Sequence, residues 1–222
     1  FWVAVVPAAL AVALLLFGVR EPPRRSDHTR VNPIRRDTLR QLPPAYWSIV
    51  AIGAVFTLAR FSEAFLVLRA QQGGLDLALT PLVLIAMNVV YAAAAYPCGA
   101  LADRVRHGRL LAWGLAVLIA ADALLAVASS GPGLWLGIAL WGLHLAMTQG
   151  LLATMVAATA PPALRGTAFG CFNLVSGLAM LVASALAGLL WDRYGAPFTF
   201  AAGGVFSAVA LAAILVRRSP AG

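Results

Sequence analysis

The feature that most constrains this chain is a series of long, nearly uninterrupted apolar runs. Seven stretches approach the ~20 residues that an α-helix needs to cross a bilayer core of about 30 Å. They lie at residues 1–19, 46–70, 78–102, 109–129, 133–158, 167–190 and 197–216. Backbone groups in lipid must be satisfied within their own segment, and the runs lack the alternation of barrel strands. We therefore predict an all-α, polytopic membrane protein with seven transmembrane helices.

The composition agrees with this fold class. Hydrophobic residues make up 62% of the chain and charged residues 11%, which lies far outside the range of a soluble domain. The formal charge of +8 comes entirely from arginine, because the sequence contains no lysine. Such a charge has two explanations, nucleic-acid binding and membrane topology. The positions of the arginines decide between them.

Most of the arginines fall on one side of the predicted membrane. Residues 20–45 form a polar segment rich in arginine and proline, which we interpret as a cytoplasmic linker by the positive-inside rule. Simple alternation of the spans then places a further set on the same side, namely Arg104, Arg106, Arg109, Arg165, Arg217 and Arg218. Only Arg69 and Arg193 flank the other side, with Arg60 inside a span. The charge is thus a topology signal, and we expect no nucleic-acid partner.

A loop signature follows the third apolar run. The segment GALADRVRHGRLL, at residues 99–111, resembles the G-x-L-A-D-R-x-G-R-R loop of the major facilitator superfamily. In that family a copy lies between the second and third helices of each half, which is its place here after the linker. The copy departs from the pattern because Val105, Arg106 and His107 precede Gly108, so the glycine is displaced.

The resemblance implies roles for several residues of this loop. Gly99 would allow two helices to approach closely, and Asp103 would cap a helix end or pair with arginine. Arg104, Arg106 and Arg109 would contact carboxylates and the bilayer surface. Together these residues form the expected gating loop.

Two further segments carry the resemblance. Residues 161–195 are similar to the fifth helix of the C-terminal half in that superfamily, which begins R-G-T-A-x-G and ends A-G-x-L-x-D-x-x-G. In this segment we predict that Gly166, Gly170 and Gly177 pack helices together. Residues 60–74 resemble the first helix of the same half in some bacterial members.

The resemblance also implies an organisation. Members of the superfamily consist of two six-helix bundles around a central cavity, joined by a long cytoplasmic linker. The chain opens at Phe1 inside an apolar run, and we expect it to be a fragment. Its predicted parts are the last helix of the N-terminal bundle (1–19), the linker (20–45), a six-helix C-terminal bundle (46–218) and a cytoplasmic tail (219–222). The implied partners are the missing N-terminal half, a small solute, the lipid bilayer and protons, and the implied location is the bacterial inner membrane.

Ionisable residues within spans are costly, so they are candidates for function. Arg60 and Glu63 are one helical turn apart in the second span and could share a face and form an ion pair. A carboxylate that alternately pairs with arginine and takes up a proton would couple proton movement to conformation. A purely structural pair remains the alternative. Asp122, in the fourth span, has no charged neighbour within a turn and needs a partner from another helix or a water-filled vestibule.

Uncharged polar residues give weaker indications. Asn88 and Gln149 are the preferred candidates for lining a cavity, although hydrogen bonds between helices would explain them equally. His144 could titrate near neutral pH, but a lone histidine more often serves packing.

Several function classes have no support in the sequence. A phosphate-binding G-x-x-x-x-G-K-[ST] loop requires lysine, so this chain cannot form one. Motifs of serine hydrolases and metalloproteases are also missing, and we predict no catalytic residue, no metal site and no cofactor. The prediction is therefore a secondary active, proton-coupled transporter rather than an enzyme. A sensor or scaffold of the same fold and a truncated, nonfunctional fragment are the alternatives.

Overall fold

The computed structural model describes residues 2–18 and 39–216, and every regular element within them is helical. The chain forms two compact units, residues 1–39 and 40–222. Most of the predicted linker and the predicted C-terminal tail lie outside the described residues. The domain boundaries given above therefore stay predictions.

The first unit contains one apolar helix. Helix α1 spans Trp2–Ala13 and continues as a π-helical turn, η1, over Leu14–Gly18. Val5–Gly18 is a short apolar helical segment. Its apolar side chains suit a lipid environment.

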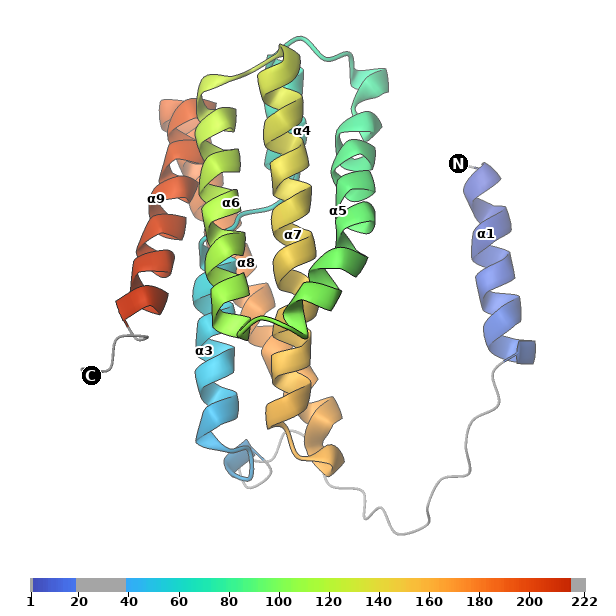
Figure 1. Cartoon of the computed structure of the whole chain (residues 1–222). Coiled ribbons are helices and arrows are strands. Elements are labelled where there is room, and N and C mark those ends of the chain that lie inside the picture. The colour runs from blue at the N-terminus through green and yellow to red at the C-terminus, as the bar shows by residue number, and fades with distance from the viewer. Residues whose placement is uncertain (1, 19–38, 217–222) are drawn as a thin grey trace. The chain divides into compact units, whose positions relative to one another are not determined.

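The second unit is a bundle of helices connected by short turns (Figure 1). In chain order it comprises α3 (Pro44–Leu58), α4 (Ala64–Gln72), η2 (Leu77–Leu79), α5 (Pro81–Ala102), α6 (His107–Val127), α7 (Gly131–Thr159), η3 (Pro162–Leu164), α8 (Arg165–Tyr194) and α9 (Ala196–Val216). Proline occupies one of the first two positions of α3, α5 and α7. Its missing N–H costs nothing there, because the first turn of a helix has no internal acceptor for it.

The segment predicted as one helix over residues 46–70 is interrupted. Helix α3 ends at Leu58 and α4 begins at Ala64, so the prediction of a continuous span is wrong (Figure 1). We call residues 59–63 the junction. The Ser207 hydroxyl of α9 donates to the Ala59 carbonyl at 3.3 Å, and the Ser62 N–H donates to the Ser184 hydroxyl of α8 at 3.2 Å. These side chains replace bonds that a continuous helix would make within itself.

The predicted count of seven spans is supported in part. Four helical segments are long and apolar enough to cross a membrane, at Leu77–Ala102, His107–Val127, Gly131–Thr159 and Pro162–Tyr194. The other apolar helices are shorter, at Val5–Gly18, Pro44–Leu58 and Ala196–Ala212. The structure thus shows an all-helical bundle suited to a membrane, and the number seven stays a prediction.

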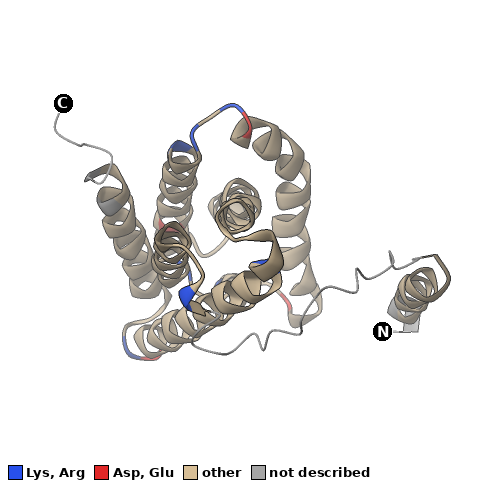
Figure 2. Ribbon diagram, turned by 90° about the horizontal axis from the view of Figure 1, so that it is seen from below, with Lys and Arg blue, Asp and Glu red and all other residues tan. Residues whose placement is uncertain are grey.

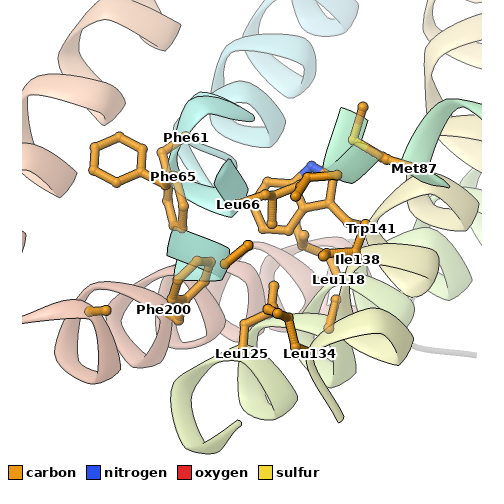
Figure 3. Packing of buried hydrophobic residues seen from close by; sticks show 14 of the residues in the cluster. Phe61, Phe65, Leu66, Met87, Leu118, Leu125, Leu134, Ile138, Trp141 and Phe200 are labelled. Atoms are coloured by element: carbon orange, nitrogen blue, oxygen red, sulfur yellow. The ribbon is translucent and has the colours of Figure 1, made fainter. Parts of the chain in front are cut away.

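The core of the bundle forms around an aromatic cluster at the junction. The Phe61 ring lies 5.2 Å from Phe65 and 5.4 Å from both Trp141 and Phe200, measured between ring centroids. Leu118 of α6 packs against the same cluster, and Figure 3 shows these side chains converging from several helices. Tilted and edge-to-face rings at such distances stabilise a packed core. The interrupted segment therefore packs against α6, α7 and α9.

Charged residues are few in the bundle, and most of its ribbon in Figure 2 has the tan colour of residues other than Lys, Arg, Asp and Glu. The outer faces of α5 and α8 are instead strongly apolar, with exposed side chains such as Leu82, Val89, Leu178 and Leu186. Surfaces of this kind indicate contact with lipid or with another apolar partner.

The predicted packing glycines and the glycines at close helix contacts in the described bundle are different residues. A Cβ atom added at Gly166, Gly170 or Gly177 would meet nothing within 4 Å in the described chain. These glycines lie on the uncovered side of α8, so within this bundle the packing prediction is not met. By contrast, a Cβ at Gly142 of α7 would fall against the Met87 carbonyl oxygen of α5. Close helix approach occurs there.

Candidate functional site

The junction places two ionisable residues in the middle of an apolar segment. Arg60 is partly buried within the junction, and Glu63 stands at the first position before α4 without capping it through its side chain. The prediction that one helical turn aligns the two is wrong, since the helix is broken between them. Within the described residues no salt bridge joins them. The two charged side chains therefore share a short segment without the fixed spacing of a helical face.

His144 of α7 lies beside the junction in a fully buried position. Its Nδ1 is 2.8 Å from the Gly114 carbonyl of α6, and because a carbonyl only accepts, Nδ1 carries the proton. Nε2 is then an acceptor, and it has no hydrogen-bond partner in the described part of the chain. The ring stacks on Phe56 with centroids 5.8 Å apart. A buried acceptor is thus left without a partner in the described bundle.

Asp122 of α6 is buried completely, and neither carboxyl oxygen has a hydrogen-bond partner among the residues described. The expected charged partner from another helix is not present there. What faces the carboxyl group is the glycine pair of α9. A Cβ at Gly203 would lie 2.9 Å from Oδ2, and a Cβ at Gly204 would lie 3.6 Å from the Asp122 Cβ. The site is therefore a close helix contact rather than a vestibule.

The two uncharged candidates lie on the outside of the bundle. Asn88 of α5 is exposed and donates through Nδ2 to the Leu84 carbonyl of its own helix at 2.8 Å. Gln149 of α7 is also exposed. Neither residue ties two described helices together, so the hydrogen-bonding alternative has no support here. Both are placed to face lipid or a further segment.

The predicted gating loop connects α5 to α6. Helix α5 ends at Ala102 with Asp103 at its C-cap position, and Asp103, Arg104 and Arg109 are all exposed. A Cβ at Gly99 would meet nothing within 4 Å of the described chain. The close approach predicted for Gly99 therefore does not occur inside this bundle.

The sequence reasoning missed Arg69, which is buried in α4. Its Nε donates to the Leu125 carbonyl at 2.8 Å and its Nη2 to the Ala126 carbonyl at 3.1 Å, both in the last turn of α6. The last carbonyls of a helix lack internal donors and carry partial negative charge, so a cation stabilises them. Arg69 lies on the side of the membrane that carries few arginines, and this unusual position could have identified it as a residue with a specific partner.

An apolar crevice of about 330 Å³ opens between α3, α8 and α9 next to the junction. Its lining includes Ala59 and Phe61 of the junction, together with Thr199 and Gly203 of α9. Over residues 2–18 and 39–216 no three His, Cys, Asp or Glu side chains are grouped so that they could hold a metal ion. The arrangement offers isolated charges and close helix contacts, not a set of ligands.

Comparison with known proteins identifies the fold family. Residues 64–222 match the Major Facilitator Superfamily. The chain is also similar to an uncharacterised MFS-type transporter of Methanocaldococcus jannaschii, with 32% identity over 201 residues that cover 87% of this chain and 49% of the relative. The chain thus spans about half the length of that curated relative. The helical bundle, the apolar outer surfaces and both matches agree, and the chain belongs to the major facilitator superfamily, a family of membrane transporters rather than enzymes.

Proposed function

We propose that this chain is part of a secondary active transporter that moves a small solute across the membrane by alternating access, coupled to protons. In this proposal the chain supplies the last helix of one bundle and the whole second bundle, giving seven spans. The rest of the first bundle is the partner that completes the solute path. The membrane is a bacterial inner membrane, with the C-terminus in the cytoplasm.

The junction is the observation that carries the proposal. It sets Arg60 and Glu63 in a segment where the α-helical hydrogen-bond pattern is interrupted, between two short helices. The junction is bound to α8 and α9 through single side-chain hydrogen bonds, at Ser184 and Ser207. A non-helical segment at membrane depth is tolerated where protein surrounds it or where it lines a cavity. Transporters use such interruptions to build their binding sites.

Glu63 is the residue to which we assign coupling. As a carboxylate it is stabilised by a nearby Arg60, and as a neutral acid it is stabilised by exclusion of water. A movement that changes the distance between the two side chains therefore changes the proton affinity of Glu63. A change in proton occupancy in turn favours one conformation, because linkage between the two is reciprocal.

The exposed polar residues complete the proposed path. Asn88 and Gln149 interrupt apolar surfaces on α5 and α7, where a polar side chain gains little from lipid. We assign them to the surface that faces the other bundle, where they would contact the solute. The α5–α6 loop with Asp103, Arg104 and Arg109 would act as a cytoplasmic gate between the two bundles.

The test is transport by the full-length protein in proteoliposomes under an imposed pH gradient. A panel containing a sugar, an organic acid and a cationic drug first identifies a transported solute. With that solute, Glu63→Gln should abolish accumulation driven by the gradient while exchange of solute at equal concentrations continues, since glutamine cannot release a proton. Arg60→Gln should reduce both activities.

Asp76→Asn is the matched control, because Asp76 is exposed and binds only the Ala78 N–H of its own turn. It should transport like the unchanged protein. Gradient-driven accumulation that survives in Glu63→Gln would contradict the assignment of coupling to Glu63. The absence of flux for every solute tested would instead favour a sensor or scaffold of the same fold.

A further inference from the structure

The contact between α6 and α9 contains a feature that the proposed transport cycle does not use. Asp122 has 0% of its surface exposed, and both of its oxygens are without a hydrogen-bond partner in the described bundle. The glycines at positions 203 and 204 of α9 leave room for its side chain, and a methyl group at position 203 would lie 2.9 Å from Oδ2. The contact is built around the carboxyl group.

No cation compensates this carboxyl group in the described structure. Helix α9 (Ala196–Val216) contains no titratable residue, and α7 contributes only His144. The interrupted segment contributes Arg60, Glu63 and Arg69, of which Arg69 is bound to the end of α6. Among residues 39–216 none of these groups forms a salt bridge or hydrogen bond with Asp122.

The absence of a partner determines the protonation state. An ionised carboxylate that is removed from water and unpaired costs far more than a neutral acid in the same place, so such a group binds a proton instead. A neutral acid also tolerates the close approach of the α9 backbone, whose surface at the glycine pair is otherwise apolar. The folded contact therefore requires the protonated form.

The same part of α9 holds the junction. Ser207, one turn beyond Gly203, donates to the Ala59 carbonyl, and Phe200 packs on Phe61. A Cβ at Gly203 would also lie 2.8 Å from the Phe61 ring. Any separation of α9 from Asp122 thus disturbs the contacts that fix the junction.

We propose that Asp122 is a proton-binding site within the α6–α9 contact, and that loss of its proton loosens α9 from the junction. In this step the O–H bond of the acid breaks, its electron pair stays on the carboxyl oxygen, and the proton passes to a water molecule that enters as the helices separate. The site is distinct from the Arg60–Glu63 pair, and the inference does not require that Glu63 couples transport.

The first measurement is infrared difference spectroscopy of the full-length protein in lipid, recorded as the unchanged protein minus Asp122→Asn. We expect the C=O band of an un-ionised carboxyl group at neutral pH. Asp192→Asn, at an exposed position at the end of α8, serves as the control for the spectral changes that any replacement of aspartate by asparagine produces. If Asp122→Asn does not fold, Asp122→Leu supplies the subtraction.

The second measurement follows the opening of the contact. Ala210 of α9 is buried and borders the crevice, so Ala210→Cys reports access when Cys98 and Cys171 are replaced by serine. The reaction rate of this cysteine with a small thiol reagent is measured in Ala210→Cys and in the double variant that also carries Asp122→Asn. The first rate is divided by the second, so that the pH dependence of the thiol itself cancels. If opening releases one proton, this ratio should rise about tenfold per pH unit before it saturates.

Each measurement can overturn the proposal. An ionised Asp122 at neutral pH would show that the group is not a proton-binding site. A reaction ratio that stays constant with pH would show that its proton does not control the α9 contact. A neutral band together with a rising ratio supports both parts.

Discussion

Two pairs of helices in the bundle are apolar enough to cross a membrane but are buried to different extents. In the most apolar part of α6 and of α7, half of the residues are covered by the rest of the described chain. In the corresponding parts of α5 and α8 only 11% are covered. Helix α6 packs on α7 and α9, whereas α8 packs mainly on α3 and α9 along a narrow strip. Apolar character alone therefore does not tell which surface of a membrane helix is a protein contact.

The small residues mark the difference. On the covered helices a side chain added at Gly137 or Gly142 would collide with a neighbouring helix. On α8 the same addition at Gly170 or Gly177 meets nothing within the described residues. Since dispersion drives helix association in lipid, contact requires close approach, and glycine permits it. The uncovered glycines of α8 are suited to contact with lipid or with a further helix.

The largest expected effect compares two tryptophans. Trp141 of α7 is fully buried, whereas Trp113 of α6 is 48% exposed. Trp141→Ala should lower the free energy of unfolding by about 3–5 kcal/mol, because it leaves a cavity in the aromatic cluster. Trp113→Ala should lower the free energy of unfolding much less, because about half of its side chain is already exposed. Unfolding of the full-length protein by denaturant in mixed micelles measures both, and equal losses would break the comparison.

The next effect concerns the end of α6. Arg69→Met removes two charged hydrogen bonds to the Leu125 and Ala126 carbonyls while keeping most of the side-chain volume. We expect a loss of about 2 kcal/mol in the same unfolding measurement. Arg106→Met at an exposed loop position is the control and should change stability little. A loss of similar size in both variants would show that Arg69 does not act through these bonds.

A smaller effect is expected at two glycines of one helix. Gly142→Ala places a methyl group against the α5 backbone, which cannot move aside as a flexible side chain can, and should cost about 1–2 kcal/mol. Gly150→Ala lies in open space in the described bundle and should stabilise α7 by about 0.5 kcal/mol through helix propensity. The comparison is clearest if Gly142→Ala lowers the free energy of unfolding and Gly150→Ala raises it. A loss at Gly150 in the full-length protein would reveal a contact with a segment outside the described bundle.

The smallest expected effect on stability is at Gln149, an exposed residue that follows the buried Thr148 in α7. Gln149→Ala should change the unfolding free energy by less than about 0.5 kcal/mol, since Gln149 is exposed. Thr148→Ala, one residue away, removes a buried hydroxyl that donates to the His144 carbonyl at 2.8 Å, and should cost more. Thermal denaturation of both variants side by side gives the ranking, and the reverse order would contradict the assigned faces of α7.

The sequence predicted the helical class and the positions of α5 to α9 closely, because long apolar runs leave few other folds. It could not predict the break at residues 59–63, since this stretch contains neither the proline nor the glycine that would mark an interruption. The hydrogen bonds that permit the break come from Ser184 and Ser207, more than a hundred residues away in the chain. The candidate residues were identifiable by charge, but their surroundings depend on contacts between helices that periodicity does not show.

The Arg69 contact bears on how the protein is made. Synthesis from the N-terminus completes α4 before α6 exists, so the guanidinium group emerges without the two carbonyls that later bind it. The two hydrogen bonds that fix α4 to the bundle therefore form only after the end of α6 has been synthesised, 56 and 57 residues later in the chain.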